Sequence, residues 1–140
     1  MHLKSLSLLL LIAAALGCTK QESFNAAVYA GNYKGEIDMV VNDSSVQQQV
    51  KEISFLPTMD YNSLEIFHNL LVTSIVTIDN NNFTIPPTVV GDNGTVRFVE
   101  YGSGSFDGDK VTIEFHQDQE SMVSGTPLRT CTYKGVLQRQ

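Results

Sequence analysis

The stretch SFDGDKVTIEFH, residues 105–116, decides the fold class of this chain. Asp107-Gly108 is a dipeptide that two-residue β-hairpin turns select, because their central residues adopt a positive φ that Asp and Gly tolerate. Beyond the turn, apolar and polar residues alternate in the order Val111, Thr112, Ile113, Glu114, Phe115 and His116. An apolar residue at every second position is typical of a half-buried β-strand. The stretch therefore predicts an antiparallel hairpin.

The same period of two runs through most of the chain after residue 30. The expected strands cover residues 33–41, 46–56, 63–72, 75–78, 83–85, 95–101, 102–106, 111–115 and 129–137. Clusters of Asn, Asp, Ser and Gly separate several of them, as in tight turns, at residues 42–45, 79–82 and 91–94. Pro86-Pro87 should end the strand at 83–85, because proline cannot donate to a sheet ladder. About eight to ten short antiparallel strands predict an all-β sandwich or barrel.

A short N-terminal helix is expected before the first strand, over residues 23–30. Phe24, Ala27 and Val28 share one of its faces, and Gly31 follows as its stop. Long crossover helices are predicted nowhere, which disfavours a parallel α/β sheet.

One tripeptide near the start of the domain recurs near its end, as Tyr33-Lys34-Gly35 and Tyr133-Lys134-Gly135. Chance is one explanation, since so short a match is not a structural repeat. The other is that the first and last strands pair, each with a mid-strand glycine where the strand bends, as barrel closure requires. On that explanation Gly35 and Gly135 lie on neighbouring strands of a closed barrel.

The N-terminus, LLLLIAAALGCTKQES at residues 8–23, passes from an apolar run to one cysteine and then to polar residues. Lys4 and an apolar run shorter than the roughly 20 residues of a membrane span have the layout of a secretory signal peptide. Ala15-Leu16-Gly17-Cys18 resembles the lipobox of bacterial lipoproteins, in which the cysteine thiol is acylated, for example with palmitate, and the chain is cut before it. The alternative is an ordinary cleaved signal with an incidental cysteine.

The lipobox resemblance implies a division of the chain into a signal peptide over residues 1–17, a lipidated tether over 18–23 and a barrel domain over 24–140. Acyl chains on Cys18 would make membrane lipid its first partner and would hold the domain on the outer membrane of the cell envelope, on either face. Cys131 would then have no second thiol to pair with, which predicts a small core residue. Nucleic acid is disfavoured as a partner, because the chain has a net charge of −6 and no basic run.

Short segments spread over the domain resemble, in their order, the lipocalin-like (calycin-like) lipoproteins of Bacteroidetes. They are Gly31-Asn32-Tyr33-Lys34-Gly35, Ser63-Leu64-Glu65-Ile66, Asn82-Phe83-Thr84-Ile85-Pro86, Gly102-Ser103-Gly104-Ser105-Phe106 and Cys131-Thr132-Tyr133-Lys134-Gly135. Lipocalins open their first strand with Gly-x-Trp; here Gly31-Asn32-Tyr33 has tyrosine instead, and the chain contains no tryptophan. The resemblance implies an antiparallel barrel of about eight strands or more and no catalytic residue.

Thr112, Glu114 and His116 are the candidate ligand-binding residues, because they share the polar face of one strand. That face either meets water or lines a polar barrel lumen, where Glu114 and His116 could contact a ligand or act as an acid/base pair.

His68 and His116 lack a metal-binding spacing, and the acidic clusters at 79–82, 92–93 and 107–109 match turn chemistry better than a calcium loop. Gly102-Ser103-Gly104 opens no helix that could bind phosphate, and no nucleophile elbow is present. We therefore expect no metal, no cofactor and no catalysis.

Two functions remain. The barrel could bind a small apolar ligand in its mouth, or a filled barrel could act through its loops as a protein-interaction or inhibitor module in the envelope. Small or polar interior side chains would favour ligand binding. Inward aromatic side chains would favour the interaction module, and the candidates are Phe55, Phe67, Phe98, Phe106, Phe115 and Tyr133.

Overall fold

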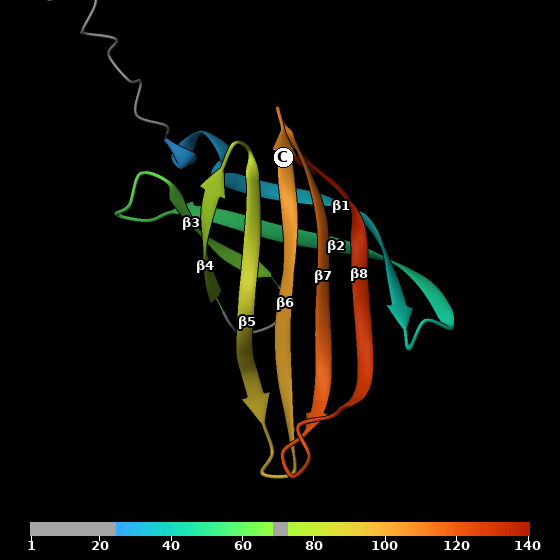
Figure 1. The fold of residues 1–140 in the computed structure, drawn as a ribbon. Coiled ribbons are helices and arrows are strands. Elements are labelled where there is room, and N and C mark those ends of the chain that lie inside the picture. The colour runs from blue at the N-terminus through green and yellow to red at the C-terminus, as the bar shows by residue number, and fades with distance from the viewer. Residues whose placement is uncertain (1–24, 69–72) are drawn as a thin grey trace, which may run out of the picture.

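The computed structural model describes residues 25–68 and 73–140; the signal peptide, Cys18 and the tether lie outside the described residues. The described residues form one 3-10 turn and eight strands: η1 (Ala26–Tyr29), β1 (Gly31–Val41), β2 (Ser45–Pro57), β3 (Ser63–His68), β4 (Thr73–Asp79), β5 (Asn82–Asp92), β6 (Val96–Asp107), β7 (Lys110–Ser121) and β8 (Pro127–Arg139). Each strand pairs with the next, and β8 returns to β1 (Figure 1). The predicted all-β antiparallel barrel is confirmed. No helix in residues 25–68 and 73–140 has the length and apolar composition of a membrane span.

The barrel closes between the two strands that carry the Tyr-Lys-Gly tripeptides. β1 pairs antiparallel with β8, and Ile37 lies opposite Gly135. A Cβ on Gly135 would lie 2.6 Å from Cγ2 of Ile37, and one on Gly35 would lie 2.6 Å from the Val136 carbonyl oxygen. Only glycine permits so close an approach of the two strands. The prediction that Gly35 and Gly135 lie on neighbouring strands of a closed sheet is confirmed.

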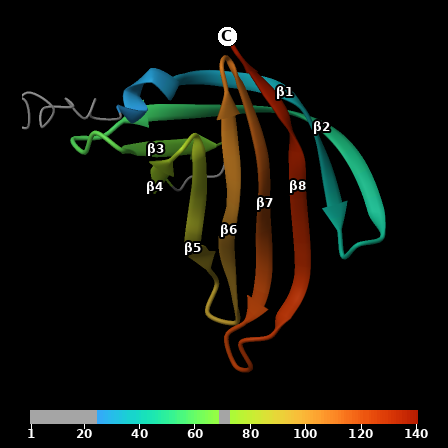
Figure 2. The same ribbon diagram turned by 45° about the horizontal axis from the view of Figure 1, so that its top comes forward.

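The two ends of the barrel differ in how many strands surround the interior. The described parts of β3 and β4 are short, and the pairs that they include between β2 and β3 cover Ile53–Pro57. β4 pairs with β5 at two positions, Ile78 with Phe83 and Asp79 with Asn82. The long strands β5–β8 and the β1–β2 hairpin continue past this region (Figures 1 and 2). We call the end near η1 the plugged end and the end near the β7–β8 loop the open end.

Aromatic rings fill the plugged end. The buried Phe55 ring contacts three others edge-on: Tyr33 at 5.4 Å, Phe83 at 5.6 Å and Phe106 at 5.0 Å between centroids. Tyr29 of η1 stacks on Phe106 with centroids 4.4 Å apart, so the 3-10 turn covers this end. We call these five residues the aromatic plug. Their contacts join β1, β2, β5 and β6, strands far apart in sequence, into one hydrophobic core.

The expected N-terminal helix is only a single 3-10 turn in the described residues; Ser23 and Phe24 lie outside them. The Asn25 side chain caps the turn by accepting from the Ala27 backbone N–H, and Ala30 is already extended, with φ −63° and ψ 140°. Arg139 Nη2 donates to the carbonyl oxygens of Val28, at 2.6 Å, and Ala30, at 2.9 Å. These carbonyls are therefore satisfied without a longer helix.

The prediction that Pro86-Pro87 ends a strand is wrong, because β5 continues to Asp92. The β5–β6 register shifts between Ile85 and Thr88, and the described pairs with β4 end before the prolines. Proline has no backbone N–H to donate, and a sheet tolerates this at a register shift or on the edge of a strand. The separate strands expected at 95–101 and 102–106 are likewise one strand, β6, which stays continuous through Gly102.

The turns predicted at 42–45, 79–82 and 107–108 are confirmed by their backbone geometry, whereas the turn predicted at 91–94 begins later because β5 continues to Asp92. Asn42 and Asn80 each have φ 47°, and their successors Asp43 and Asn81 have φ 56° and 72°. Gly108 has φ 57° between β6 and β7. These left-handed conformations are the ones that Asn, Asp and Gly adopt at low cost.

Candidate functional site

The polar face of β7 lies on the outside of the barrel. Val111, Ile113 and Phe115 point into the hydrophobic core, and alternation directs Thr112, Glu114 and His116 outward. Of the two alternatives, the structure therefore shows the one in which this face lies outside the barrel, and the lumen alternative is excluded. Whether they contact a ligand from the outer surface stays a prediction.

A row of polar contacts crosses β6, β7 and β8 on this outer face. Lys134 Nζ lies 2.8 Å from Glu114 Oε2, and this hydrogen bond and charge hold the pKa of Glu114 below its usual range. His116 Nδ1 lies 3.0 Å from Thr132 Oγ1. Glu114 and His116 approach only to 3.9 Å, beyond hydrogen-bonding distance, so they do not form an acid/base pair in this structure.

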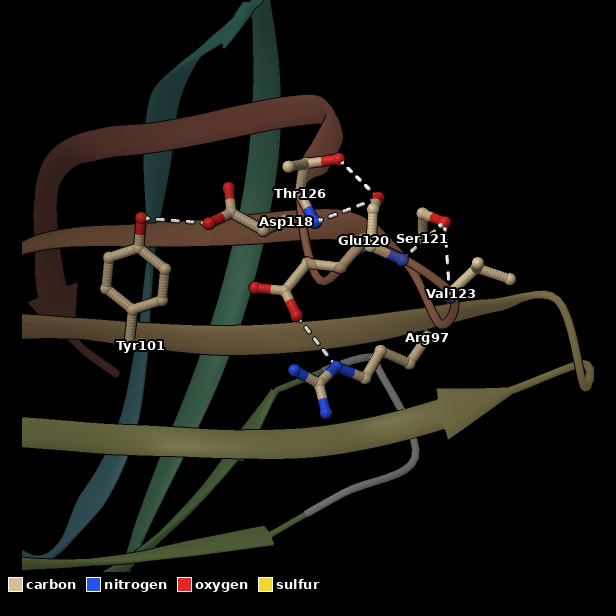
Figure 3. Close-up of polar contacts among 8 residues, drawn as sticks. Arg97, Tyr101, Asp118, Glu120, Ser121, Val123 and Thr126 are labelled. Carbon is tan, nitrogen blue, oxygen red and sulfur yellow. Dashed lines mark hydrogen bonds and ion pairs between the residues drawn. The ribbon is translucent and has the colours of Figure 1, made fainter.

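The row continues toward the open end around the buried carboxylate of Asp118. It accepts hydrogen bonds from the Tyr101 hydroxyl at 3.1 Å and the Thr130 hydroxyl at 2.7 Å. Burial, followed by the hydrogen bond and charge of Asp118, raises the pKa of Tyr101. Arg97 Nε lies 2.7 Å from Glu120 Oε2 one step further along (Figure 3). Each charge on this outer row has a partner, which is what a structural surface network requires.

Inside the barrel, the open end contains a hollow of about 240 Å³. Its lining combines apolar and polar side chains from β1, β6, β7 and β8: Met39, Phe98, Gln117, Gln119, Arg129, Cys131 and Tyr133. Strand register explains the set, because Gln117 lies opposite Cys131 and Gln119 opposite Arg129 on the inward phase. We call this cavity the open-end hollow.

The floor of the open-end hollow is aromatic and surrounded by charge. The Tyr133 ring stacks on Phe115 with centroids 4.5 Å apart, and Lys51 Nζ lies 5.3 Å from the Tyr133 centroid. Burial, and then the neighbouring Cys131 and Glu100, raises the pKa of the Tyr133 hydroxyl above its usual range. Gln117 Nε2 donates to the buried Glu100 carboxylate at 2.9 Å. The floor can therefore contact both apolar and polar ligand groups.

The polar residues of this hollow were missed in the sequence, although a signal for them is present. The apolar phase of β7, Val111, Ile113 and Phe115, continues as Gln117 and Gln119. Glutamines on an inward phase indicate an interior that is not packed with apolar side chains. The prediction for Cys131 is confirmed, because this free cysteine is buried in the core cluster beside the hollow.

Within the part of the chain that the structure describes, no group of His, Cys, Asp and Glu side chains has an arrangement that could hold a metal ion. In comparisons with known proteins, no family model, curated protein or solved structure matches the chain. The proposals that follow therefore depend on the chain's own residues.

Proposed function

We propose that this protein is a non-catalytic envelope lipoprotein, anchored by acyl chains on Cys18, whose lipocalin-like barrel binds a small ligand at its open end. The observation that carries the ligand proposal is the open-end hollow, which lies beyond the aromatic plug and has a mixed lining. The plug occupies the other end of the interior, so a long apolar ligand has no path through the barrel.

The lining favours a ligand with an apolar body and an acidic group. The hollow of about 240 Å³ is smaller than the roughly 300–1,000 Å³ of drug-sized pockets, so the ligand is small. Phe98 and Met39 offer apolar contacts, while Arg129 offers a guanidinium that pairs geometrically with a carboxylate. Glu100 lies nearby, but its carboxylate already accepts from Gln117.

Benzoate is expected to bind the open-end hollow more tightly than uncharged benzyl alcohol of the same shape. Arg129→Gln should weaken benzoate binding about tenfold, because one charge-assisted contact contributes about 1.5 kcal/mol. The same variant should leave benzyl alcohol binding unchanged. Chemical-shift titration of isotopically labelled protein measures both affinities and locates the perturbed residues.

Arg97→Gln is the matched control, since Arg97 pairs with Glu120 on the outer face and does not line the hollow. It should not alter benzoate affinity. Shifts confined to Thr112, Glu114 and His116 would move the ligand site to the outer face. The absence of binding at millimolar benzoate would contradict ligand binding by this hollow.

The anchor has its own test. Cys18→Ser is expected to abolish incorporation of labelled fatty acid and to move the protein from the detergent phase to the aqueous phase, because each acyl CH₂ contributes about 0.8 kcal/mol to membrane binding. Cys131→Ala is the control and should label normally, since that thiol is buried. Continued labelling and membrane association of the Cys18→Ser protein would exclude the anchor.

The filled interior supports the second candidate, a protein-interaction or inhibitor module. Of the six aromatic residues named as candidates, four are buried in the core cluster: Phe55, Phe106, Phe115 and Tyr133. Phe98 lines the open-end hollow, and Phe67 points outward. Apolar side chains are also exposed around the β7–β8 loop, at Met122, Val123 and Leu128. A negative ligand titration would favour this candidate, with that loop as the contact surface.

A further inference from the structure

The β2–β3 loop carries two large exposed side chains. Met59 has an exposed fraction of 104% and Tyr61 one of 73%. Large apolar side chains gathered at one exposed place are typical of an interaction surface. Tyrosine is also enriched where an apolar region meets water, because its ring is apolar and its hydroxyl is polar.

The loop holds these side chains outward through its own hydrogen bonds. The Thr58 hydroxyl accepts from the Asp60 backbone N–H at 3.1 Å and lies 3.2 Å from the Ser63 carbonyl oxygen, which fixes both ends of the loop. The Ala26 backbone N–H donates to the Tyr61 carbonyl oxygen at 2.6 Å. The loop is therefore joined directly to the first described residues of the domain.

The loop lies beside the residues at which the described chain begins, and this position indicates what the loop contacts. η1 and the β2–β3 loop lie on the same side of the barrel in both views (Figures 1 and 2). From Cys18 to Asn25 an extended chain spans at most about 25 Å, at 3.3–3.6 Å per residue. Acyl chains on Cys18 would hold this side of the domain within that distance of a bilayer. Val28, exposed on η1, adds a third apolar side chain there.

We propose that Met59 and Tyr61 enter the headgroup region of the bilayer, so that the plugged end faces the membrane and the open-end hollow faces away from it. This inference rests on the proposed lipid anchor. The partner is a zwitterionic lipid surface, because the chain carries a net charge of −6 and Asp60 lies between the two side chains. An anionic lipid surface would repel the acidic domain and the Asp60 carboxylate.

A single introduced tryptophan tests this contact by its fluorescence. No other tryptophan contributes to the emission, because the chain contains none. Met59→Trp should show blue-shifted emission and strong quenching by brominated acyl chains when the lipidated protein is bound to phosphatidylcholine vesicles. Val123→Trp is the matched control, on the β7–β8 loop at the open end, where the native side chain has an exposed fraction of 93%. It should keep water-like emission and little quenching. Both substitutions are at exposed positions, so neither should alter folding.

The outcomes separate the docking inference from the anchor. Flotation of both variants with the vesicles supports the anchor, and failure of both to float contradicts the anchor and the docking together. If both float but Trp emission of the Met59→Trp protein stays water-like, the docking surface is wrong while the anchor stands. Equal quenching of the two variants would also overturn the proposal, because it would mean that the domain has no fixed orientation on the bilayer.

Discussion

Replacing Phe55 by alanine is expected to lower the free energy of unfolding by about 3–5 kcal/mol. Phe55 is 0% exposed and its ring contacts those of Tyr33, Phe83 and Phe106, so the substitution leaves a cavity at the centre of the aromatic plug. Neighbouring strands hold these rings in place and cannot close the cavity freely. Since whole domains are stable by only about 5–15 kcal/mol, the loss is a large part of the total. Urea unfolding followed by far-UV circular dichroism measures it.

Phe67→Ala is the matched control for this prediction. Phe67 lies on the adjacent strand β3, opposite Ser54, and is 40% exposed on the outer face. Its truncation should lower the free energy of unfolding by about 1 kcal/mol or less, because little cavity forms. Equal losses for the two variants would contradict the packing of the Phe55 ring at the centre of the aromatic plug.

Gly102→Ala is expected to destabilise the barrel by about 3 kcal/mol through steric overlap. A Cβ at this position of β6 would lie 2.4 Å from the Glu114 carbonyl oxygen and 2.6 Å from Cα of Phe115. Both are main-chain atoms of β7, so the two strands would have to separate along their pairing. Local preference acts in the opposite direction, since alanine is better than glycine in a regular element by about 0.5–1 kcal/mol. The steric overlap is the larger of the two effects, so the net change in stability is a loss.

Gly91→Ala provides the comparison, because a Cβ on Gly91 has no neighbour within 4 Å and the backbone there is not left-handed. It should leave stability unchanged or raise it by up to about 1 kcal/mol, through a smaller entropy of the unfolded chain. The two substitutions are chemically identical and lie on adjacent strands, so chemical denaturation should show a clear loss of stability for Gly102→Ala and no loss for Gly91→Ala. A gain of stability in Gly102→Ala would show that the β6–β7 spacing is more tolerant than described.

The candidate site was predicted only in part from the sequence, and β7 shows why. Alternation correctly grouped Thr112, Glu114 and His116 on one face, but it did not reveal that the polar residues lining the open-end hollow lie on the other phase. Gln117 and Gln119 belong to the inward phase of Phe115 and line the open-end hollow. What surrounds Gln117 and Gln119 depends on which other strands enclose the barrel at that level. The sequence of β7 alone does not contain this information.

The sequence by itself determined the all-β class, most of the strands and their turns, and it favoured the closure. Side chains of an extended chain alternate between faces in any context, so the period of two was sufficient for the hairpin at residues 105–116. Left-handed turn positions select Asn, Asp and Gly locally, as at Asn80-Asn81. The two Tyr-Lys-Gly tripeptides indicated the pairing of β1 with β8, because close strand approach requires glycine.

Only the tertiary structure decided what each position faces. Pro86-Pro87 does not end β5, because the described β4 pairs stop before it and no donor is needed there. The interior is packed with rings at Phe55 and hollow at Gln117, and the described residues of β3 and β4 contribute to the core but do not line the hollow. Burial depends on contacts between strands that are distant in sequence, and a local pattern along one strand does not contain them.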